Sequence, residues 1–330
     1  MSLFTEDPIK TLALDHPLQY AHSLIDSANL RKTSISSSLK DKLRRHFSAL
    51  KLNPQYIDEL NVSDCVAKIY NIGIECDPTE EQDRLWIYAS TLVVILFQFD
   101  DHFDKSYNIP ENLSRISMEM RTLLRALSRH GLSGLQGDLD DWPTTVPCRE
   151  AYLWLLREAD SLRNGAAELT HYTFLDYCFG VEMEIMDWAP DVYRGDTVAW
   201  SLKRYDDVRK RSAGVAFAMA GPLYIANKWI TKEHVTSCND LLYDASVIAG
   251  LANDILGMKK DQEKESEAIT ITAIKIASAN EIAQQHNEKA ESFRKDIQAL
   301  EGDARRFMEE MEVGVVGLFL WQLNARRYIK

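Results

Sequence analysis

The chain has 330 residues, enough to bury a core without disulfides or a structural metal, and 50 acidic against 38 basic residues give a formal net charge of −12. That sign disfavours binding to the phosphate backbone of nucleic acids. A hydrophobic content of 45%, a charged content of 27% and only 14 glycines and 9 prolines predict a folded protein made of long helices.

Apolar residues recur at helical spacing in most long windows of the chain. Between Leu85 and Phe99 they predict an almost wholly buried helix that runs into Asp100. Similar patterns predict helices over 36–50, 57–74, 112–130, 149–187, 200–228, 233–262, 267–300 and 303–327. Gly, Pro and Asp concentrate in Leu132–Pro147 and Ala189–Thr197, which are predicted loops. Because the same helical character flanks both loops, we expect one all-α domain over residues 1–330.

Cysteine usage and the apolar runs indicate the compartment. The five cysteines include no C-x-x-C pair, which predicts buried thiols rather than disulfides or a zinc site. The N-terminus has acids and a proline where a signal peptide has a basic start and an apolar stretch. The longest apolar runs, Thr91–Phe97 and Val313–Trp321, are shorter than the ~20 residues that span a bilayer. We expect a cytoplasmic protein without membrane insertion.

A first acidic motif, FQFDDHFD, ends the apolar helix of residues 85–99. Asp100 and Asp104 are four residues apart and share one helix face, whereas Asp101 points about 100° away. Two carboxylates beside an apolar wall suit a hard divalent cation such as Mg²⁺, which takes oxygen ligands and shares them with phosphate groups. The alternative is a solvated, acidic helix end.

A second motif, NDILGMKKD, ends the helical pattern of residues 233–262. Asn253, Gly257 and Asp261 follow each other at intervals of four residues, so they lie along one helix face. Asn253 and Asp261 offer a second set of oxygen ligands on that face. The alternative is a helix break followed by a solvated run of charges.

In this order, the two motifs resemble those of the class I terpene synthases (terpene cyclases) of the single-domain microbial kind. That family has a DDxxD-type motif after an apolar helix, followed later by N-D-x-x-[ST]-x-x-[KR]-E. Four further matches support the resemblance: Arg209 in the segment YDDVRKRS, Lys260 before the last position of the second motif, Trp321 with Arg327 and Tyr328 in the C-terminal WQLNARRY, and Phe97 three residues before Asp100. The resemblance extends from about residue 85 to the C-terminus.

The resemblance implies a helical bundle around a central apolar cavity and Mg²⁺-dependent ionisation and cyclisation of a linear prenyl diphosphate. Farnesyl diphosphate is favoured, and geranylgeranyl diphosphate stays open. The implied metal ligands are Asp100, Asp104, Asn253 and Asp261. The implied diphosphate-binding residues are Arg209, Lys260, Arg327 and Tyr328. At Ser212 and Ala213 the family interrupts a helix so that a backbone carbonyl reaches the substrate.

Two aromatic side chains are candidates for stabilising the cations of the reaction. Ring faces attract cations, and the resemblance places Phe97 beside the cavity, with Trp321 as a second candidate. The alternative for both is ordinary core packing.

The sequence departs from the family pattern at two positions. Gly257 stands where the family has Ser or Thr, and Asp261 where it usually has Glu. Gly257 offers no side-chain oxygen, so that a water would have to complete the shell of the metal. Weaker metal binding, or an inactive protein that binds an isoprenoid, therefore stays an alternative. A prenyl chain-elongating synthase is less favoured because the chain lacks a second complete DDxxD motif. A homodimer is left open.

Overall fold

The computed structural model of the chain describes residues 37–70, 79–107, 110–130, 141–194, 202–264 and 279–322. All regular structure in these ranges is helical, which confirms the predicted all-α class. The helices are α3 (Ser37–Ala49), α4 (Tyr56–Glu59), α5 (Val62–Tyr70), α6 (Glu80–Tyr107), α7 (Pro110–His130), α8 (Arg149–Leu162), α9 (Ala166–Arg194), α10 (Leu202–Ser212), α11 (Val215–Ala226), α12 (Lys232–Ser237), α13 (Asn239–Lys264), α15 (Ala279–Ala299) and α16 (Gly302–Gln322). None of these helices combines the length and apolar character needed to cross a bilayer.

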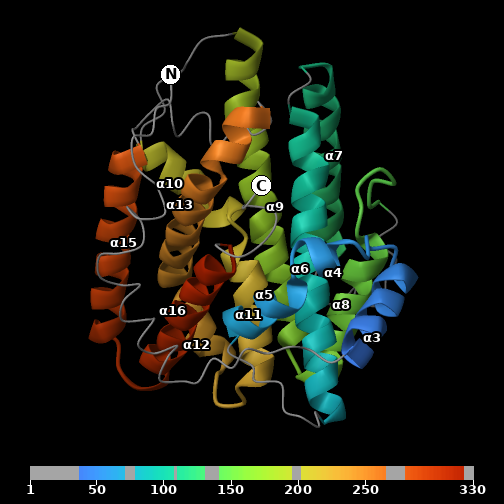
Figure 1. The fold of residues 1–330 in the computed structure, drawn as a ribbon, viewed down its shortest axis with the longest axis vertical. Helices are drawn as coiled ribbons and strands as arrows, with labels where there is room; N and C mark the ends of the chain where they lie inside the picture. The colour runs from blue at the N-terminus through green and yellow to red at the C-terminus, as the bar shows by residue number, and fades with distance from the viewer. Residues whose placement is uncertain are drawn as a thin grey trace.

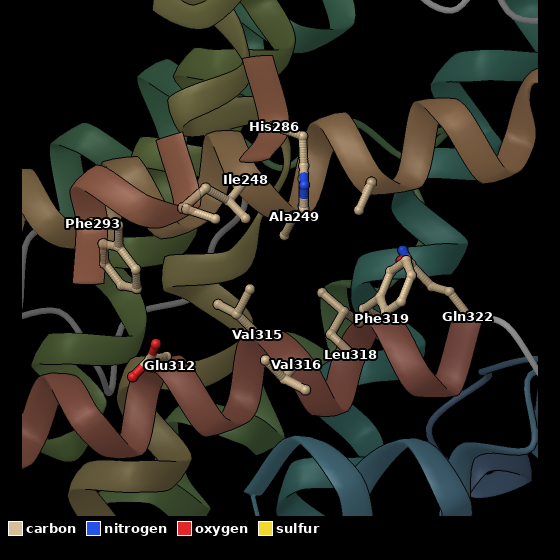
Figure 2. Close-up of a pocket in the computed structure, with 12 residues that line it drawn as sticks. Ile248, Ala249, His286, Phe293, Glu312, Val315, Val316, Leu318, Phe319 and Gln322 are labelled. Carbon is tan, nitrogen blue, oxygen red and sulfur yellow. The ribbon is translucent and has the colours of Figure 1, made fainter. Parts of the chain in front are cut away.

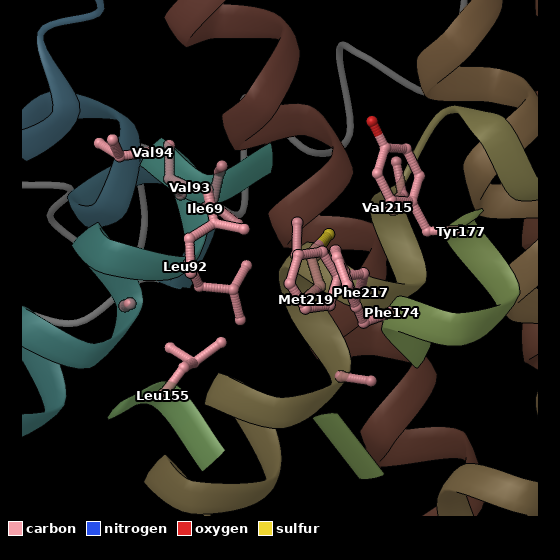
Figure 3. Packing of buried hydrophobic residues seen from close by; sticks show 14 of the residues in the cluster. Ile69, Leu92, Val93, Val94, Leu155, Phe174, Tyr177, Val215, Phe217 and Met219 are labelled. Carbon is pink, nitrogen blue, oxygen red and sulfur yellow. The ribbon is translucent and has the colours of Figure 1, made fainter. Parts of the chain in front are cut away.

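Helix α11 lies at the centre of the bundle because it is apolar on all sides. Its sequence, VAFAMAGPLYIA, contains no charged residue, and the helix packs against α5, α6, α8, α9, α13 and α16 (Figure 1). Figure 3 shows Phe217 and Met219 of α11 beside Phe174 of α9, with Leu92 of α6 facing them. The Phe174 and Phe217 rings are 4.9 Å apart between centroids. The long helices α6, α9 and α13, which carry acidic residues, are thereby fixed around α11.

Several predicted helices are divided where the backbone leaves the helical region. The predicted helix over 149–187 is two helices, because Arg163 is extended and Gly165 has a φ of +80°. Between them, the Arg163 guanidinium donates to the carbonyl oxygens of Asn227 and Lys228. The pattern over 57–74 is likewise broken at Asn61, where φ is +45°, and that over 233–262 at Cys238. Apolar periodicity continues across such breaks, so it could not locate them.

The predicted loop over Ala189–Thr197 is wrong as far as Arg194, because α9 continues to that residue; 195–197 lie outside the described ranges. Pro190 removes one backbone hydrogen bond without ending the helix, as Pro222 does within α11. The predicted buried thiols are confirmed for the four described cysteines: Cys65, Cys148, Cys178 and Cys238.

The expected interruption near Ala213 is confirmed. Gly214 lies between α10 and α11 with a φ of +67°, in the left-handed region that favours glycine. A Cβ atom there would lie 2.6 Å from Leu96 Cδ1 of α6. The break therefore depends on both the conformation and the small size of Gly214.

Candidate active site

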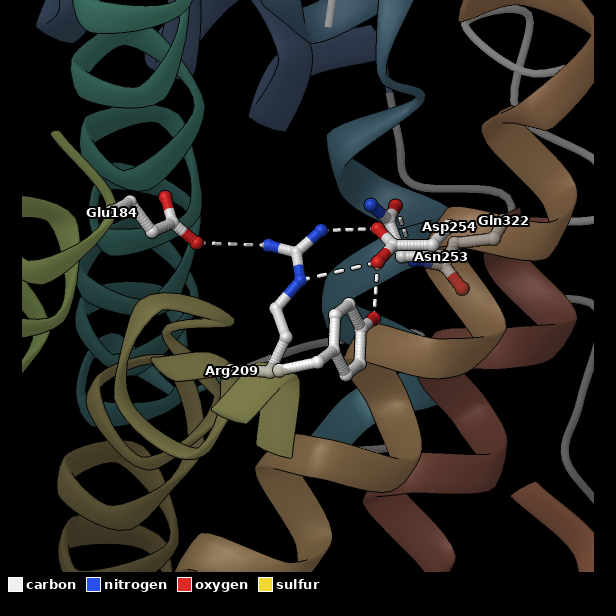
Figure 4. A network of polar contacts seen from close by, with 6 residues as sticks. Glu184, Arg209, Asn253, Asp254 and Gln322 are labelled. Carbon is white, nitrogen blue, oxygen red and sulfur yellow. Dashed lines mark hydrogen bonds and ion pairs between the residues drawn. The ribbon is translucent and has the colours of Figure 1, made fainter. Parts of the chain in front are cut away.

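A buried cluster of charged side chains joins α9, α10 and α13. Arg209 of α10 is 9% exposed, and its guanidinium lies between two carboxylates (Figure 4). Its Nε donates to Asp254 Oδ2 at 3.2 Å, its Nη2 to Asp254 Oδ1, and its Nη1 to Glu184 Oε1 at 3.5 Å. Arg209 is therefore a buried ion-pair residue and not one of the solvated cations of its basic segment.

Tyr205 completes this cluster one helical turn before Arg209. Its hydroxyl donates to Asp254 Oδ2, the same oxygen that accepts from Arg209 Nε. The spacing of four residues places Tyr205 and Arg209 on one face of α10, so that both can reach α13. Asp254 is 2% exposed and accepts from two side chains of α10, which fixes the orientation of its carboxylate.

The electrostatics of the cluster connect it to the first acidic motif. Burial raises the pKa of Glu184 to about 7, Arg209 opposes this rise, and the negative charges of Asp100 and Asp254 add to it. Burial also opposes the charge of Arg209, but its acidic neighbours outweigh that effect and hold its pKa well above the ordinary value. Asp100 of α6 and Asp254 of α13 thus act on the same carboxyl group of α9. When ionised, the three carboxylates and one guanidinium carry an excess of negative charge.

Close backbone contacts hold the end of α10 in this site. A Cβ atom on Gly180 of α9 would lie 2.4 Å from the backbone N of Ser212, and one on Gly250 of α13 would lie 3.4 Å from Ala213 Cβ. Only glycine at position 180 allows α9 to approach the helix break this closely, whereas a Cβ atom at position 250 would make a close but tolerable contact. The Ser212 hydroxyl is buried near Glu184 but outside good hydrogen-bonding geometry.

The structure describes the side chains of only some residues of the two predicted metal motifs. Asp100 and Asn253 are half-buried, and Asn253 Oδ1 accepts a hydrogen bond from Gln322 Nε2 at 3.1 Å. Asp104 and Asp261 lie in α6 and α13, but their side chains fall outside the described part of the chain, as does that of Lys260. Arg327 and Tyr328 lie beyond the last described residue. Within the described ranges, no three His, Cys, Asp or Glu side chains form a metal site by themselves. The full ligand set stays a prediction.

The two predicted cavity aromatics pack against each other. The Phe97 and Trp321 rings are 5.5 Å apart between centroids, and Trp321 is fully buried. Trp321 Nε1 donates to the backbone carbonyl of Leu60 at 2.6 Å, which satisfies its polar edge and leaves the ring face for apolar contact. This arrangement fits both a cavity wall and core packing, so the role of the pair stays a prediction.

An apolar pocket lies on another side of α13, between α13, α15 and α16. Figure 2 shows Val315 and Phe319 of α16 directed toward Ile248 and Ala249 of α13. Phe97 and Trp321 do not line this pocket. Gln322 lies at one end of it and reaches Asn253 from there.

Sequence reasoning missed the roles of Glu184, Asp254 and Gln322. Glu184 could have been found, because it occupies a buried position in an apolar helical pattern with Tyr177 and Val181. Asp254 was seen only as the second residue of the Asn-Asp pair, and nothing local indicates that it binds Arg209. Gln322 has no local signal at all.

The comparisons with known proteins decide the family. The family model described as "Terpene synthase family 2, C-terminal metal binding" matches residues 91–285, more than half of the chain. The chain belongs to this terpene synthase family. It is therefore a terpene synthase, and the predicted resemblance is confirmed. The matched range includes Asp100, Arg209 and Asn253.

Solved structures show the same fold at low sequence identity. A variant of cucumene synthase is 14% identical with a TM-score of 0.62 and covers 88% of this chain and 95% of its own. Linalool/nerolidol synthase from Streptomyces clavuligerus, in complex with 2-fluorogeranyl diphosphate, is 13% identical with a TM-score of 0.60, at 88% and 94% coverage. Aristolochene synthase from Penicillium roqueforti is 13% identical with a TM-score of 0.53, at 89% and 98%. The comparison with curated protein sequences gave no match.

Proposed function

We propose that this terpene synthase ionises and cyclises a linear prenyl diphosphate, with farnesyl diphosphate favoured over geranylgeranyl diphosphate, and releases diphosphate. The observation that carries the proposal is the buried guanidinium of Arg209, held between Glu184 and the Asp254 carboxylate next to Asn253. Asp100 of the first motif acts on the same buried carboxyl group as Asp254, the neighbour of Asn253 in the second motif. A similar fold holds a prenyl diphosphate analogue in linalool/nerolidol synthase, which supports the substrate class.

The donor atoms at this site fit Mg²⁺. Asp100 and Asn253 offer hard oxygen atoms, as Asp104 and Asp261 would, and no thiol or imidazole belongs to the set. The carboxylates also outnumber the guanidinium, so the net negative charge of the site favours binding of a cation. When bound, Mg²⁺ neutralises the charge that develops on the diphosphate as the carbon–oxygen bond breaks.

Arg209 is the proposed anchor for the diphosphate. A guanidinium has five N–H donors, and the contacts with Asp254 and Glu184 engage three of them. These contacts fix the plane of the guanidinium before the substrate arrives, which lowers the entropic cost of a two-pronged contact with phosphate oxygens. Lys260, Arg327 and Tyr328 are proposed to add charge-assisted hydrogen bonds. The helix break at Ser212 and Ala213 is proposed to aim a backbone carbonyl at the substrate.

The hydrocarbon part of the substrate needs an apolar, water-free environment after ionisation. Phe97 and Trp321 are proposed to supply ring faces, each of which attracts a carbocation by about 0.5–2 kcal/mol. The indole N–H of Trp321 already donates to the backbone carbonyl of Leu60, so it does not hold a water molecule beside the cation. The released diphosphate can accept the final proton, and the proposal needs no separate histidine base.

Diphosphate release tests the proposal. The protein is incubated with Mg²⁺ and geranyl, farnesyl or geranylgeranyl diphosphate, and released diphosphate and extracted products are measured. We expect Arg209→Lys to lower turnover at least about 10-fold, because a point charge cannot replace the planar fork. Arg211→Lys is the matched control: Arg211 pairs with Asp176 on a partly exposed face, and turnover should stay within about twofold.

Other outcomes identify the alternatives. Binding of a prenyl diphosphate without release of diphosphate would refute the enzyme proposal and favour an isoprenoid-binding protein. Formation of a longer prenyl diphosphate on addition of isopentenyl diphosphate would favour chain elongation.

A homodimer through α7 and α9 is proposed as the partner interaction. The large apolar side chains that are exposed in the described ranges gather on these two helices: Met118, Tyr172, Phe179 and Met186. The three on α9 are spaced by seven residues, the repeat of a helix-packing stripe. The exposed face of α7 carries Arg121, Arg125 and Arg129, so a two-fold copy could place these arginines against the aromatic stripe of α9.

Sedimentation velocity tests the dimer. We expect Phe179→Glu to convert a dimeric protein into a monomer, whereas Gln284→Glu on the exposed face of α15 should leave the dimer intact. A wild-type protein that sediments as a monomer at micromolar concentration would refute this assignment.

A further inference from the structure

The second metal motif lacks one oxygen ligand. Gly257 stands at the position where related sequences are expected to have Ser or Thr, and glycine has no side-chain oxygen. Asn253, one turn earlier on α13, is half-buried and offers a single amide oxygen. A divalent cation at this motif therefore needs an oxygen from elsewhere in the protein or from water.

Gln322, the last residue of α16, presents its amide group to the same place. It is 4% exposed, and its Nε2 donates to Asn253 Oδ1 at 3.1 Å (Figure 4). Its Oε1 is buried without a hydrogen-bond partner within the described structure. A buried acceptor without a donor is unfavourable, and such atoms in a native protein call for an explanation.

The distance between the two amide groups suits a shared cation. Mg²⁺ holds its ligands at about 2.1 Å in octahedral geometry, so that two neighbouring ligand atoms lie about 3 Å apart. The Gln322 amide is 3.1 Å from Asn253 Oδ1. The oxygen and the nitrogen of an amide have nearly the same size, and a half-turn of the amide exchanges them in place. The half-turn would put Oε1 where Nε2 now lies.

We propose that Gln322 supplies Oε1 as an oxygen ligand to the divalent cation that Asn253 binds, in place of the side chain that Gly257 lacks. Without the cation, the amide NH₂ of Gln322 occupies the same position and donates to Asn253 Oδ1. With the cation bound, Oε1 is a metal ligand and the NH₂ group takes the buried position that Oε1 holds without the cation. This inference rests on the proposed function, because it assumes that Asn253 is a metal ligand.

Two near-isosteric variants test the proposal by metal binding rather than by turnover. Binding of Mn²⁺ and Mg²⁺ is measured by titration calorimetry and Mn²⁺ electron paramagnetic resonance in the presence of inorganic diphosphate. Gln322→Met removes the oxygen and should weaken cation binding about 10-fold. Gln322→Glu keeps an oxygen and adds charge, so binding should be at least as tight as in the wild type.

The Glu variant separates a ligand from a residue that only positions Asn253. A carboxylate cannot donate a hydrogen bond to Asn253 Oδ1, so a purely positioning role predicts weaker binding for Gln322→Glu as well as for Gln322→Met. Weaker binding in Gln322→Glu, or unchanged binding in Gln322→Met, would overturn the proposal. Gln284→Met, on the exposed face of α15, is the matched control and should leave binding unchanged.

Rescue gives a second, independent readout. Gly257→Ser restores an oxygen on α13, so the double variant Gln322→Met/Gly257→Ser should recover most of the lost affinity. Failure of the rescue, in a double variant whose circular dichroism matches the wild type, would count against the shared cation. If the wild type binds no divalent cation even with diphosphate, the proposed function itself fails. If it binds one and Gln322→Met matches it, only the role of Gln322 fails.

Discussion

Removal of the Asp254 carboxylate should destabilise the fold far more than removal of an ordinary surface acid. Asp254 is 2% exposed and Arg209 is 9% exposed, so Asp254→Ala leaves a buried guanidinium with Glu184, at 3.5 Å, as its remaining described acidic contact. The variant also removes the acceptor of the Tyr205 hydroxyl. Breaking a buried ion pair on one side costs about 3–5 kcal/mol. We expect a loss of that size in the free energy of unfolding.

Urea denaturation and thermal unfolding measure this loss. With an unfolding entropy of about 2.1 cal/mol/K per residue, a chain of 330 residues changes its Tm by about 1.4 °C per kcal/mol, so that Tm should fall by about 4–7 °C. Asp207→Ala is the control, because Asp207 is 42% exposed and its pair with Lys210 is worth less than about 1 kcal/mol. The double variant Arg209→Met/Asp254→Leu should recover much of the stability, since it leaves neither partner of that pair in the core. A loss for Asp254→Ala no larger than that for Asp207→Ala would refute the reasoning.

Three further predictions concern other parts of the site. Asp100→Ala should abolish diphosphate release while circular dichroism shows an intact fold; unimpaired product formation would show that the first motif is only a solvated helix end. The pKa of Glu184 is raised from 4.5 to about 7, so its contribution to stability is present below pH 4.5 and is lost as the pH rises through 7. Glu184→Gln should therefore flatten the fall in unfolding free energy between about pH 5 and 7, and an unchanged slope would contradict the assignment. Gly214→Ala should cost at least about 1–2 kcal/mol, measured by urea denaturation, because alanine is strained at a φ of +67° and its Cβ atom would lie 2.6 Å from Leu96 Cδ1.

Helical periodicity predicted most of the fold because the helices bury one face each against a neighbour. It predicted the apolar helix that runs into Asp100, although α6 continues beyond the predicted end to Tyr107. The interruption near Ala213 came from the family resemblance, because the apolar pattern over 200–228 continues across it. Periodicity failed at Gly165 and Asn61, where a single residue of positive φ divides an apolar pattern that continues on both sides. The rule that proline ends a helix failed at Pro190, because α9 continues through this residue to Arg194.

The site was predictable only where a local motif carried it. Asp100 and Asn253 belong to patterns that can be read within one helix, and Arg209 to a basic segment that fits the family. The partners of Arg209 come from α9 and α13, and no spacing along the chain indicates that Glu184 and Asp254 meet it. Gln322 is more distant still, because its contact with Asn253 depends on the packing of α16 against α13. Contacts of this kind follow from the tertiary fold and not from periodicity.

The charge of the cluster explains how an acidic protein can bind an anionic substrate. Arg209 is largely neutralised by Asp254 and Glu184, and Asp100 adds further negative charge, so the cluster alone does not attract diphosphate. Cations bound by Asp100 and Asn253 would reverse this balance, and the diphosphate would in turn supply the remaining oxygen ligands of those cations. Cation and diphosphate should then strengthen each other's binding by the same factor, since coupling between two binding equilibria is reciprocal. An oxygen from Gln322 in place of the one missing at Gly257 would increase the cation affinity on the protein's side of this coupling without adding charge to an already acidic site.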